Sequence, residues 1–429
     1  MILETLRDAW KVSSIRKKIA FTLLMLLVFR IGSHIPIPFM DRDLLQNMMG
    51  SGGLFDFFNT FSGGSLKRFS VFALSIMPYI TASIIITLLT VVVPYLERLS
   101  KEGEQGRKKI AQLTRYATVV LGFINGFGLT IGLRNALTIP QENLRYPIYI
   151  MVALVLTAGT AFLMWLGEQI TEKGIGNGIS LIIFCGIVAG IPDVVKNMVS
   201  LLKVGELNWF AVLGLAIIAA AIIAGVIFIQ EGQRRIPVQY AKRVVGRKVY
   251  GGQSSHIPLK VNQAGVIPII FGVSLVAFPA TIATWFPSDS GFATFANKWM
   301  TMNGELTSIP YLVVYALLII FFTFFYTGIT FNPIDVADNL KKYGGFIPGI
   351  RPGRPTSDYL FKIMNKITLA GGIFLAIIAV IPSLIMGFTN ITNIYLGGTS
   401  LLIVVSVALD TMKQMENQLL QRHYQGFLK

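Results

Sequence analysis

Long apolar segments alternate with shorter polar ones along nearly the whole chain. Ten of these segments are apolar enough to form helices in a bilayer whose hydrocarbon core is about 30 Å thick. They cover residues 19–37, 69–96, 116–133, 147–166, 179–191, 209–229, 264–286, 309–331, 367–388 and 394–409. The fifth segment is short and could be re-entrant, although apolar residues as far as Leu201 extend it to spanning length. The pattern predicts an all-α polytopic membrane protein with ten transmembrane helices.

The composition supports this fold class. Of the 429 residues, 53% are hydrophobic and only 14% are charged, and the mean hydropathy is +0.65. Soluble domains carry about 25% charged residues, so this composition excludes a soluble globular protein. Cys185 is the single cysteine, which excludes an intrachain disulfide, and we interpret it as a small packing residue.

The Lys and Arg residues predict the orientation of the chain, because they favour the cytoplasmic side of short loops. If the N-terminus lies inside, 28 of the 37 Lys and Arg residues face the cytoplasm. Nearly all of the net charge of +16 then lies on that face. We therefore expect both termini to be cytoplasmic, and we interpret the first apolar segment as an uncleaved span and not as a signal peptide.

Two predicted cytoplasmic connections, residues 231–260 and 332–366, are long and basic. The first interleaves its Lys and Arg residues with Val, Tyr and Gly, a pattern typical of a β-hairpin. Positive-inside topology and contact with anionic lipids would explain the charge without a protein partner. A docking surface for a ribosome or another large acidic partner would explain both the charge and the length. Because topology alone does not need loops this long, the sequence favours docking.

The sequence lacks the usual enzymatic motifs. It has no GxxxxGK[ST] phosphate-binding loop, no HExxH and no GxSxG, and its three histidines lie in different loops. We therefore expect neither an enzyme nor a cofactor or metal site. Arg30 is the only clear charge within a predicted span, and we expect a structural role for it, with its cost reduced by snorkelling or by a partner carbonyl. Ion-coupled carriers normally keep carboxylates or histidines at mid-membrane, so a multispanning small-solute transporter is the less favoured alternative.

Two prolines are consistent with movable helices. Pro78 and Pro268 lie near the starts of the second and seventh segments, where a missing amide hydrogen bond and a ring clash would weaken the helix and permit bending. Movable helices are what a gate needs. Most prolines in membrane helices are plain kinks, which is the alternative interpretation.

An aromatic segment precedes the second predicted helix. Residues 55–61 read Phe-Asp-Phe-Phe-Asn-Thr-Phe, and Ser62, Gly63 and Gly64 follow them. A segment this short cannot cross a bilayer, but it could fold back into the membrane on a glycine hinge. Anchoring of the aromatic side chains at the membrane interface is the simpler interpretation, and the sequence alone favours it.

Isoleucines recur at a spacing of four residues in two of the predicted helices. Ile76 and Ile80 form one such pair, and Ile179 and Ile183 form another, so each pair lies on one helix face. Facing a lumen, such bulky apolar side chains would close it by excluding water. Contact with lipid or with neighbouring helices is the more common role of isoleucine pairs in a membrane protein.

Eight short motifs, in order along nearly the whole chain, resemble the bacterial SecY family. They are FRIG at 29–32 with IPIP at 35–38, NTFSGG at 59–64, MPYI at 77–80, GEQITE at 167–172, GIGNGIS at 174–180, GQRRI at 232–236, GIRPG at 349–353 and GGTS at 397–400. Members of this family are channel subunits of the protein-translocation complex. The resemblance implies a protein-conducting channel that passes unfolded secretory proteins across the bacterial cytoplasmic membrane and releases hydrophobic segments sideways into the lipid.

The resemblance also implies the architecture of the pore. Two pseudo-symmetric halves would surround the pore. The first half is residues 1–205 with helices one to five, and the second is residues 206–429 with helices six to ten. A ring of apolar residues closes the pore in this family, and all six corresponding positions are isoleucine here: Ile76, Ile80, Ile179, Ile183, Ile270 and Ile403.

Two movable parts follow from the same resemblance. Residues 55–66 correspond to a plug, in which we single out Phe55, Phe57, Phe58, Phe61, Gly63 and Gly64. The second and seventh helices correspond to a lateral gate, in which we place Pro78, Thr81, Pro268 and Phe278.

The family's partners are also implied by the resemblance. They are small SecE-like and SecG-like membrane subunits, the SecA motor ATPase, the ribosome, and the signal sequences of secretory and membrane proteins. The motor or the ribosome would dock on the two basic loops through Arg234, Arg235, Arg243, Arg247, Lys248, Arg351 and Arg354. Arg351 lies in the motif most identified with motor function.

Overall fold

A computed structural model describes residues 10–41, 62–133, 146–205, 208–240, 254–283, 290–299, 309–389 and 398–426, together with residues 7, 59, 243–245, 248–250 and 286. These residues are mostly helical. The long helices are α2 (Ser13–Gly32), α5 (Met77–Val92), α7 (Glu104–Gly132), α8 (Tyr146–Lys173), α9 (Gly178–Val204), α10 (Trp209–Glu231), α11 (Ile267–Ala283), α13 (Ile309–Thr330), α15 (Arg354–Thr389) and α16 (Gly398–Gly426). Three shorter helices are α6 (Pro94–Lys101), α12 (Gly291–Trp299) and α14 (Pro333–Lys342).

Each predicted apolar segment overlaps one of these long helices. Within the described ranges, five helices are long and apolar enough to cross a membrane, and the bent pair of α5 and α6 would be a sixth. The protein is therefore a multi-pass membrane protein. The ambiguous fifth segment forms α9, whose 27 residues at 1.5 Å each give about 40 Å, enough to span a bilayer.

The second predicted segment is not one continuous helix. Its α-helix begins only at Met77, and α5 and α6 meet at an angle of 99°. The bend lies at Val93, whose extended backbone (φ −95°, ψ 113°) is the conformation that a residue before a proline prefers, because Pro94 follows it.

Pro78 and Pro268 do not weaken their helices from within. Pro78 lies in the first turn of α5, and Pro268 is the second residue of α11. At these positions a proline removes no hydrogen bond of the helix, since its amide would have no partner within the helix anyway. The predicted reason for bending, a missing hydrogen bond and a ring clash at these two prolines, was therefore wrong.

The predicted β-hairpin of the first basic loop is present. The strands are β1 (Gln233–Tyr240), β2 (Arg243–Val245), β3 (Lys248–Tyr250), β4 (Ser254–Lys260) and β5 (Gly345–Phe346). β1 pairs antiparallel with β4, and β5 of the second basic loop pairs with the other edge of β1, while β2 and β3 form a separate small hairpin. Ile236 and Val238 of β1 pack with Leu340 of α14 and Leu360 of α15. The two basic loops therefore form one folded unit.

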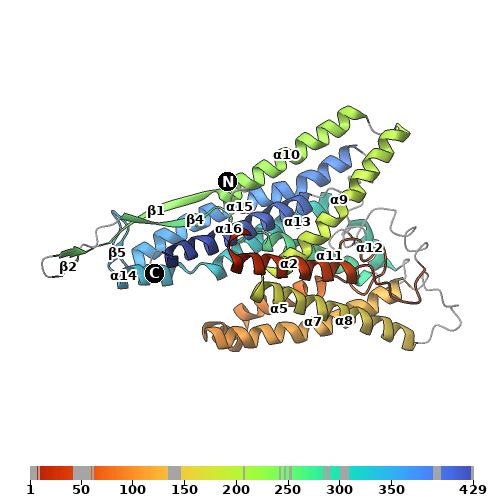
Figure 1. The fold of residues 1–429 in the computed structure, drawn as a ribbon, viewed down its shortest axis with the longest axis horizontal. Helices are drawn as coiled ribbons and strands as arrows, with labels where there is room; N and C mark the ends of the chain where they lie inside the picture. The colour runs from red at the N-terminus through yellow and green to blue at the C-terminus, as the bar shows by residue number, and fades with distance from the viewer. Residues whose placement is uncertain are drawn as a thin grey trace.

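The helices pack in two groups that meet at a common core (Figure 1). α5, α7 and α8 lie side by side, and α11, α13 and α15 form a second group. α10 packs on α16, and α9 contacts α2, α8 and α16. The two groups touch directly where α5 contacts α11. The largest apolar cluster takes residues from both groups and from α2, α9, α10 and α16, which places the core between the groups.

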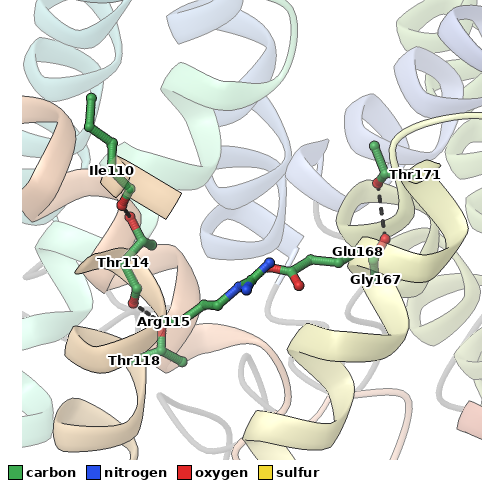
Figure 2. A network of polar contacts seen from close by, with 7 residues as sticks. All are labelled: Ile110, Thr114, Arg115, Thr118, Gly167, Glu168 and Thr171. Carbon is green, nitrogen blue, oxygen red and sulfur yellow. Dashed lines mark hydrogen bonds and ion pairs between the residues drawn. The ribbon is translucent and has the colours of Figure 1, made fainter. Parts of the chain in front are cut away.

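The predicted cytoplasmic segments lie at one end of the molecule, the end that carries β1 and β4 in Figure 1. Figure 2 shows Arg115 of α7 reaching across to Glu168 of α8, with Nε 2.8 Å from Oε1. Lys413 of α16 pairs with Glu231 at the start of the first basic loop, with Nζ 2.8 Å from Oε1. The start of α2, the α8–α9 connection and α16 share a small apolar cluster of Ile15, Ile175 and Met415.

Candidate functional site

The six predicted ring isoleucines all belong to the largest apolar cluster or pack against it, and this cluster takes residues from both helix groups. Five are almost fully buried in the largest apolar cluster, with exposed fractions of 1% for Ile76, 5% for Ile80, 2% for Ile183, 9% for Ile270 and 0% for Ile403. Ile179 is partly buried and packs against the same cluster. The side chains belong to α5 or the residue before it, α9, α11 and α16, which are far apart in the sequence.

Helix geometry explains why the paired isoleucines point the same way. The amide of Ile80 donates a hydrogen bond to the carbonyl oxygen of Ile76 (3.0 Å), so the two side chains share a face at the start of α5. Ile179 and Ile183 have the same spacing within α9. A constriction of such side chains cannot replace the water of a hydrated ion, which is the condition for a seal.

The start of α9 is fixed by the motif at residues 174–180. Asn177 caps the helix, because its Oδ1 accepts a hydrogen bond from the amide of Ser180 (3.2 Å). Gly176 has a φ of +89°, a left-handed conformation that favours glycine. A side chain at Gly178 would collide with the carbonyl oxygen of Gly167 in α8. The motif thus sets where α9 begins and how closely it packs on α8.

Two residues that the sequence did not single out hold this motif in place. Thr22 of α2 accepts a hydrogen bond through Oγ1 from the amide of Ile175 (3.1 Å). Gln414 of α16 accepts one through Oε1 from the amide of Gly176 (3.1 Å). Buried amides in a glycine-rich turn need acceptors, but the sequence does not indicate which helix supplies them. The start of α9, the helix that carries Ile183, is therefore held by α2 near the N-terminus and by α16 near the C-terminus.

Of the predicted plug, residues 55–66, the structure describes residue 59 and residues 62–66. Phe55, Phe57, Phe58 and Phe61 lie outside the described residues. Gly63 and Gly64 have φ values of +65° and +82°, so the chain turns there in left-handed conformations. Gly63 is buried against α9, where an added Cβ would lie 2.9 Å from the Cα of Gly186. Because Ile183 lies one turn before Gly186, this hinge is close to the isoleucine cluster.

Of the two alternatives for Arg30, snorkelling and a carbonyl partner, the structure shows a carbonyl partner. Arg30 Nη1 donates a hydrogen bond of 3.0 Å to the carbonyl oxygen of Gly63. This bond links the C-terminal end of α2 to the turn at Gly63, and it offsets part of the cost of a charge inside the membrane.

The two helices of the predicted lateral gate are in contact. α5 and α11 pack together, and Ile80 and Ile270 from these helices lie in the same apolar cluster. Thr81 is partly buried, and its hydroxyl donates to the carbonyl oxygen of Met77 within α5 (3.1 Å). Phe278 of α11 is 44% exposed. The seam between α5 and α11 thus lies beside the isoleucine cluster.

Several of the predicted docking residues lie on the folded unit of the basic loops. Arg234 and Arg235 are exposed on β1, opposite Leu259 and Pro258 of β4. Arg243 and Lys248 belong to the small hairpin of β2 and β3, and Arg247 lies outside the described residues.

Arg351 and Arg354 lie on the second basic loop. Arg351 is exposed in the turn that precedes α15, between two glycines with left-handed backbones, Gly349 (φ +79°) and Gly353 (φ +100°). The hydroxyl of Thr356 donates to the carbonyl oxygen of Arg351 (2.8 Å), which fixes this turn to α15. Arg354 is the first residue of α15 and is also exposed. The turn therefore presents the side chain of Arg351 outward without using it in the fold.

Comparisons with known proteins cover nearly the whole chain. The SecY family model matches residues 70–412. Protein translocase subunit SecY of Halalkalibacterium halodurans is 52% identical over 432 residues, and the match covers 99% of both chains. The same subunit of Bacillus subtilis is 49% identical, again over 99% of both chains.

Solved structures of channels share the fold. A protein conducting channel gives a TM-score of 0.69 at 18% identity, and a SecY whose plug domain stabilises the closed state gives 0.68 at 17% identity. Sec61 of a canine ribosome–channel complex gives 0.64 at 17% identity. Each comparison covers 94% of this chain and 92% of the other. The full-length sequence matches and the family model together show that the chain belongs to the SecY family of protein translocase subunits.

Proposed function

We infer that the protein is the channel through which a translocase moves unfolded secretory proteins across a membrane. Members of its family are translocase subunits and not enzymes, so its activity is passage and not catalysis. The inference about mechanism rests on one observation: five ring isoleucines are buried in the largest apolar cluster, and the sixth, Ile179, packs against it. Such a constriction can exclude ions and still part for an extended chain, because no polar bond has to break.

The two halves of the channel are residues 1–205 and 206–429, related by pseudo-symmetry and contributing ten crossings in all. Support for this division comes from the packing, since α5, α7 and α8 form one group and α11, α13 and α15 form another. The isoleucine cluster at their contact is the position that a central pore would occupy.

Residues 55–66 are proposed to act as the plug, and the seam between α5 and α11 as the lateral gate. The position of Gly63 against α9, close to Ile183, supports the plug. A related SecY has a plug domain that stabilises its closed state and maintains a membrane seal. The contact between α5 and α11 supports the gate. Thr81 and Phe278 are our proposed facing residues on the two helices.

The proposed setting is the bacterial cytoplasmic membrane, with both termini and both basic loops inside. The excess of Lys and Arg on these segments supports this orientation, as does their position at one end of the molecule. The folded unit of basic loops would receive a SecA motor or a ribosome, and a Sec61 relative was solved in a ribosome–channel complex. SecE-like and SecG-like subunits, signal sequences and anionic lipids complete the proposed partners.

Depletion of the protein from its host tests the function. Unprocessed secretory precursors should accumulate, because a precursor that does not cross the membrane keeps its signal sequence. Immunoblots of several precursors measure this, and expression of the wild-type chain from a plasmid should restore processing. A small-solute transporter, the alternative function, would leave processing unchanged. Normal processing after verified depletion would therefore contradict the channel.

Arg351→Glu should reduce motor-driven export by about tenfold or more, because a charge-assisted hydrogen bond to a partner is worth about 1.5–3 kcal/mol. Arg351 is exposed on a turn that the backbone and Thr356 hold in shape, so assembly with the partner subunits should stay normal. Export in vesicles supplied with the motor and ATP measures the effect. Lys203→Glu, a charge reversal at an exposed position in the last turn of α9 and outside both basic loops, is the matched control. Normal export in the Arg351 variant would contradict binding of the motor by Arg351. Its charge would then serve only the orientation of the chain in the membrane.

A further inference from the structure

A short helix, α12, packs on the end of α11 away from the basic loops. α12 comprises nine residues, Gly291–Trp299, and Figure 1 shows it at the end of the molecule opposite β1 and β4. It contacts α11, and Ala296 of α12 forms a small buried cluster with Ala283, the last residue of α11. Small side chains at this contact let the two helices approach closely, so α12 is held against the end of α11.

Three phenylalanines beside this contact are exposed. Phe286, Phe292 and Phe295 have exposed fractions of 49%, 43% and 52%. The rings of Phe286 and Phe292 pack edge to face, with their centroids 5.7 Å apart. Phe292 and Phe295 are three residues apart in α12, so they lie on the same side of the helix. The three rings therefore form one exposed surface, which we call the aromatic face of α12.

A different side of α12 is polar. At 3.6 residues per turn, Thr294 lies away from Phe292 and Phe295. Thr294 is exposed, and its hydroxyl donates a hydrogen bond to the carbonyl oxygen of Ser290 (3.1 Å). α12 is thus amphipathic. Helices of this kind lie in the plane of a membrane surface, with their apolar side buried by about 5–10 Å.

The bilayer is the partner that the aromatic face fits, because the face continues the apolar surface of α11. α11 contains no charged residue, and its Leu275 is 43% exposed, as lipid contact allows in a membrane protein. We propose that α12 is an interfacial helix that places its aromatic face at the boundary of headgroups and acyl chains, and so holds the end of α11 at a fixed depth. This contact goes beyond the proposed function, because it does not require α11 to belong to a gate.

Fluorescence quenching by lipids tests where the aromatic face lies. Phe295→Cys, in a chain whose Cys185 is replaced by alanine, carries a fluorophore within the complete translocase, whose other subunits are made free of cysteine. The vesicles contain phosphatidylethanolamine and phosphatidylglycerol. A nitroxide near the lipid headgroup should quench this fluorophore more than a nitroxide at the end of the acyl chain, because the apolar side is buried by only about 5–10 Å.

Thr294→Cys, the neighbouring position on the polar side, is the matched control. Iodide in the water should quench a fluorophore there more than at position 295, and the nitroxide lipids should quench it less. Quenching of position 295 by iodide alone would contradict the proposal, because the aromatic face would then lie in water. Quenching by neither reagent would place the face against another protein, and stronger quenching by the deep nitroxide would place it in the hydrocarbon core. Either result would also overturn the proposal.

A second variant tests whether α12 holds the depth of α11. Phe292→Ser and Phe295→Ser together remove two of the three rings, and a fluorophore at Leu275→Cys reports the depth of α11. The ratio of quenching by the shallow and deep nitroxides at position 275 should change in this variant. Val313→Ser, which removes an exposed apolar side chain from α13, should leave the ratio unchanged.

The yield of assembled complex is measured in parallel, so that loss of the fold is recognised. If the double variant does not assemble, Phe295→Ser alone takes its place, since it leaves the contact between Phe286 and Phe292 intact. An unchanged quenching ratio in an assembled variant would overturn the role of α12 as an anchor. None of these measurements depends on protein export, so a failure of the proposed function would not imitate a failure of the anchor.

Discussion

A disulfide between cysteines introduced by Thr81→Cys on α5 and Phe278→Cys on α11 should abolish both protein export and membrane-protein insertion until it is reduced. A signal helix made of apolar residues must leave an aqueous pore for lipid, so two helices have to part along their length. α5 and α11 are in contact beside the isoleucine cluster, which makes them the pair that would part. The bond itself requires Cα atoms within about 7 Å, so it can form only while the helices touch.

The experiment uses a chain in which Cys185 is replaced by alanine. Cys185 is the single native cysteine and lies on α9, so its removal prevents other disulfides. Each single-cysteine variant, treated with the same oxidant, controls for the substitutions and for oxidation. Insertion of a reporter membrane protein and export of a secretory precursor are measured before and after reduction. Full insertion of the reporter while the crosslink is verified would contradict a lateral exit between α5 and α11.

Ile183→Ser and Ile403→Ser together should raise the resting ion conductance of the reconstituted complex by an order of magnitude or more. Both side chains are almost completely buried in the apolar cluster, and hydroxyl groups there would supply the polar lining that a hydrated ion needs. Conductance across a planar bilayer measures the seal. Truncating a buried isoleucine also costs about 2–5 kcal/mol of stability, so assembly of the complex has to be checked in parallel.

Ile217→Ser is the matched control for the ring. Ile217 lies on α10 and is 60% exposed, so the same substitution there changes a surface position and not the cluster. Its conductance should equal that of the wild type. If Ile183→Ser and Ile403→Ser leave the conductance unchanged in an intact complex, the ring assignment is wrong.

The apolar pattern predicted where helices lie better than where they end. α15 begins at Arg354, well before its apolar segment, and α16 continues to Gly426, well after its own. The reason is that charged and polar residues can continue a helix beyond the bilayer, whereas hydropathy detects only the part that faces lipid or the core. The bend at Val93 is the opposite case, because the apolar run continues through a break that Pro94 causes.

The positions of the isoleucines could be predicted from the sequence, but their burial in one apolar cluster could not. The spacing of Ile76 and Ile80 puts them on one helix face, and the family resemblance supplied the other members of the ring. That Ile403 lies in the same cluster is a result of tertiary packing between helices more than 300 residues apart in the chain.

Polar contacts were the part of the site that the sequence did not reveal. Gln414 binds the amide of Gly176, and Arg68 binds the carbonyl of Gly63, yet neither residue belongs to a motif. For Arg30, the sequence left snorkelling and a carbonyl partner as alternatives, because a charge in a span needs one or the other, and it did not identify Gly63. The chemistry of a lone polar group predicts that it has a partner, and only the fold determines which one.

Photocrosslinking from the ring to a chain in transit tests the central claim most directly. A photoreactive amino acid is placed at Ile403, and a secretory precursor with a folded C-terminal domain is arrested halfway through the complete translocase. A photoreactive residue at Leu213, which is 62% exposed on α10, is the matched control. The channel account predicts a crosslink between the arrested precursor and position 403 and none at position 213. A precursor that is verifiably arrested but crosslinks at neither position, or only at 213, would contradict passage through the isoleucine cluster.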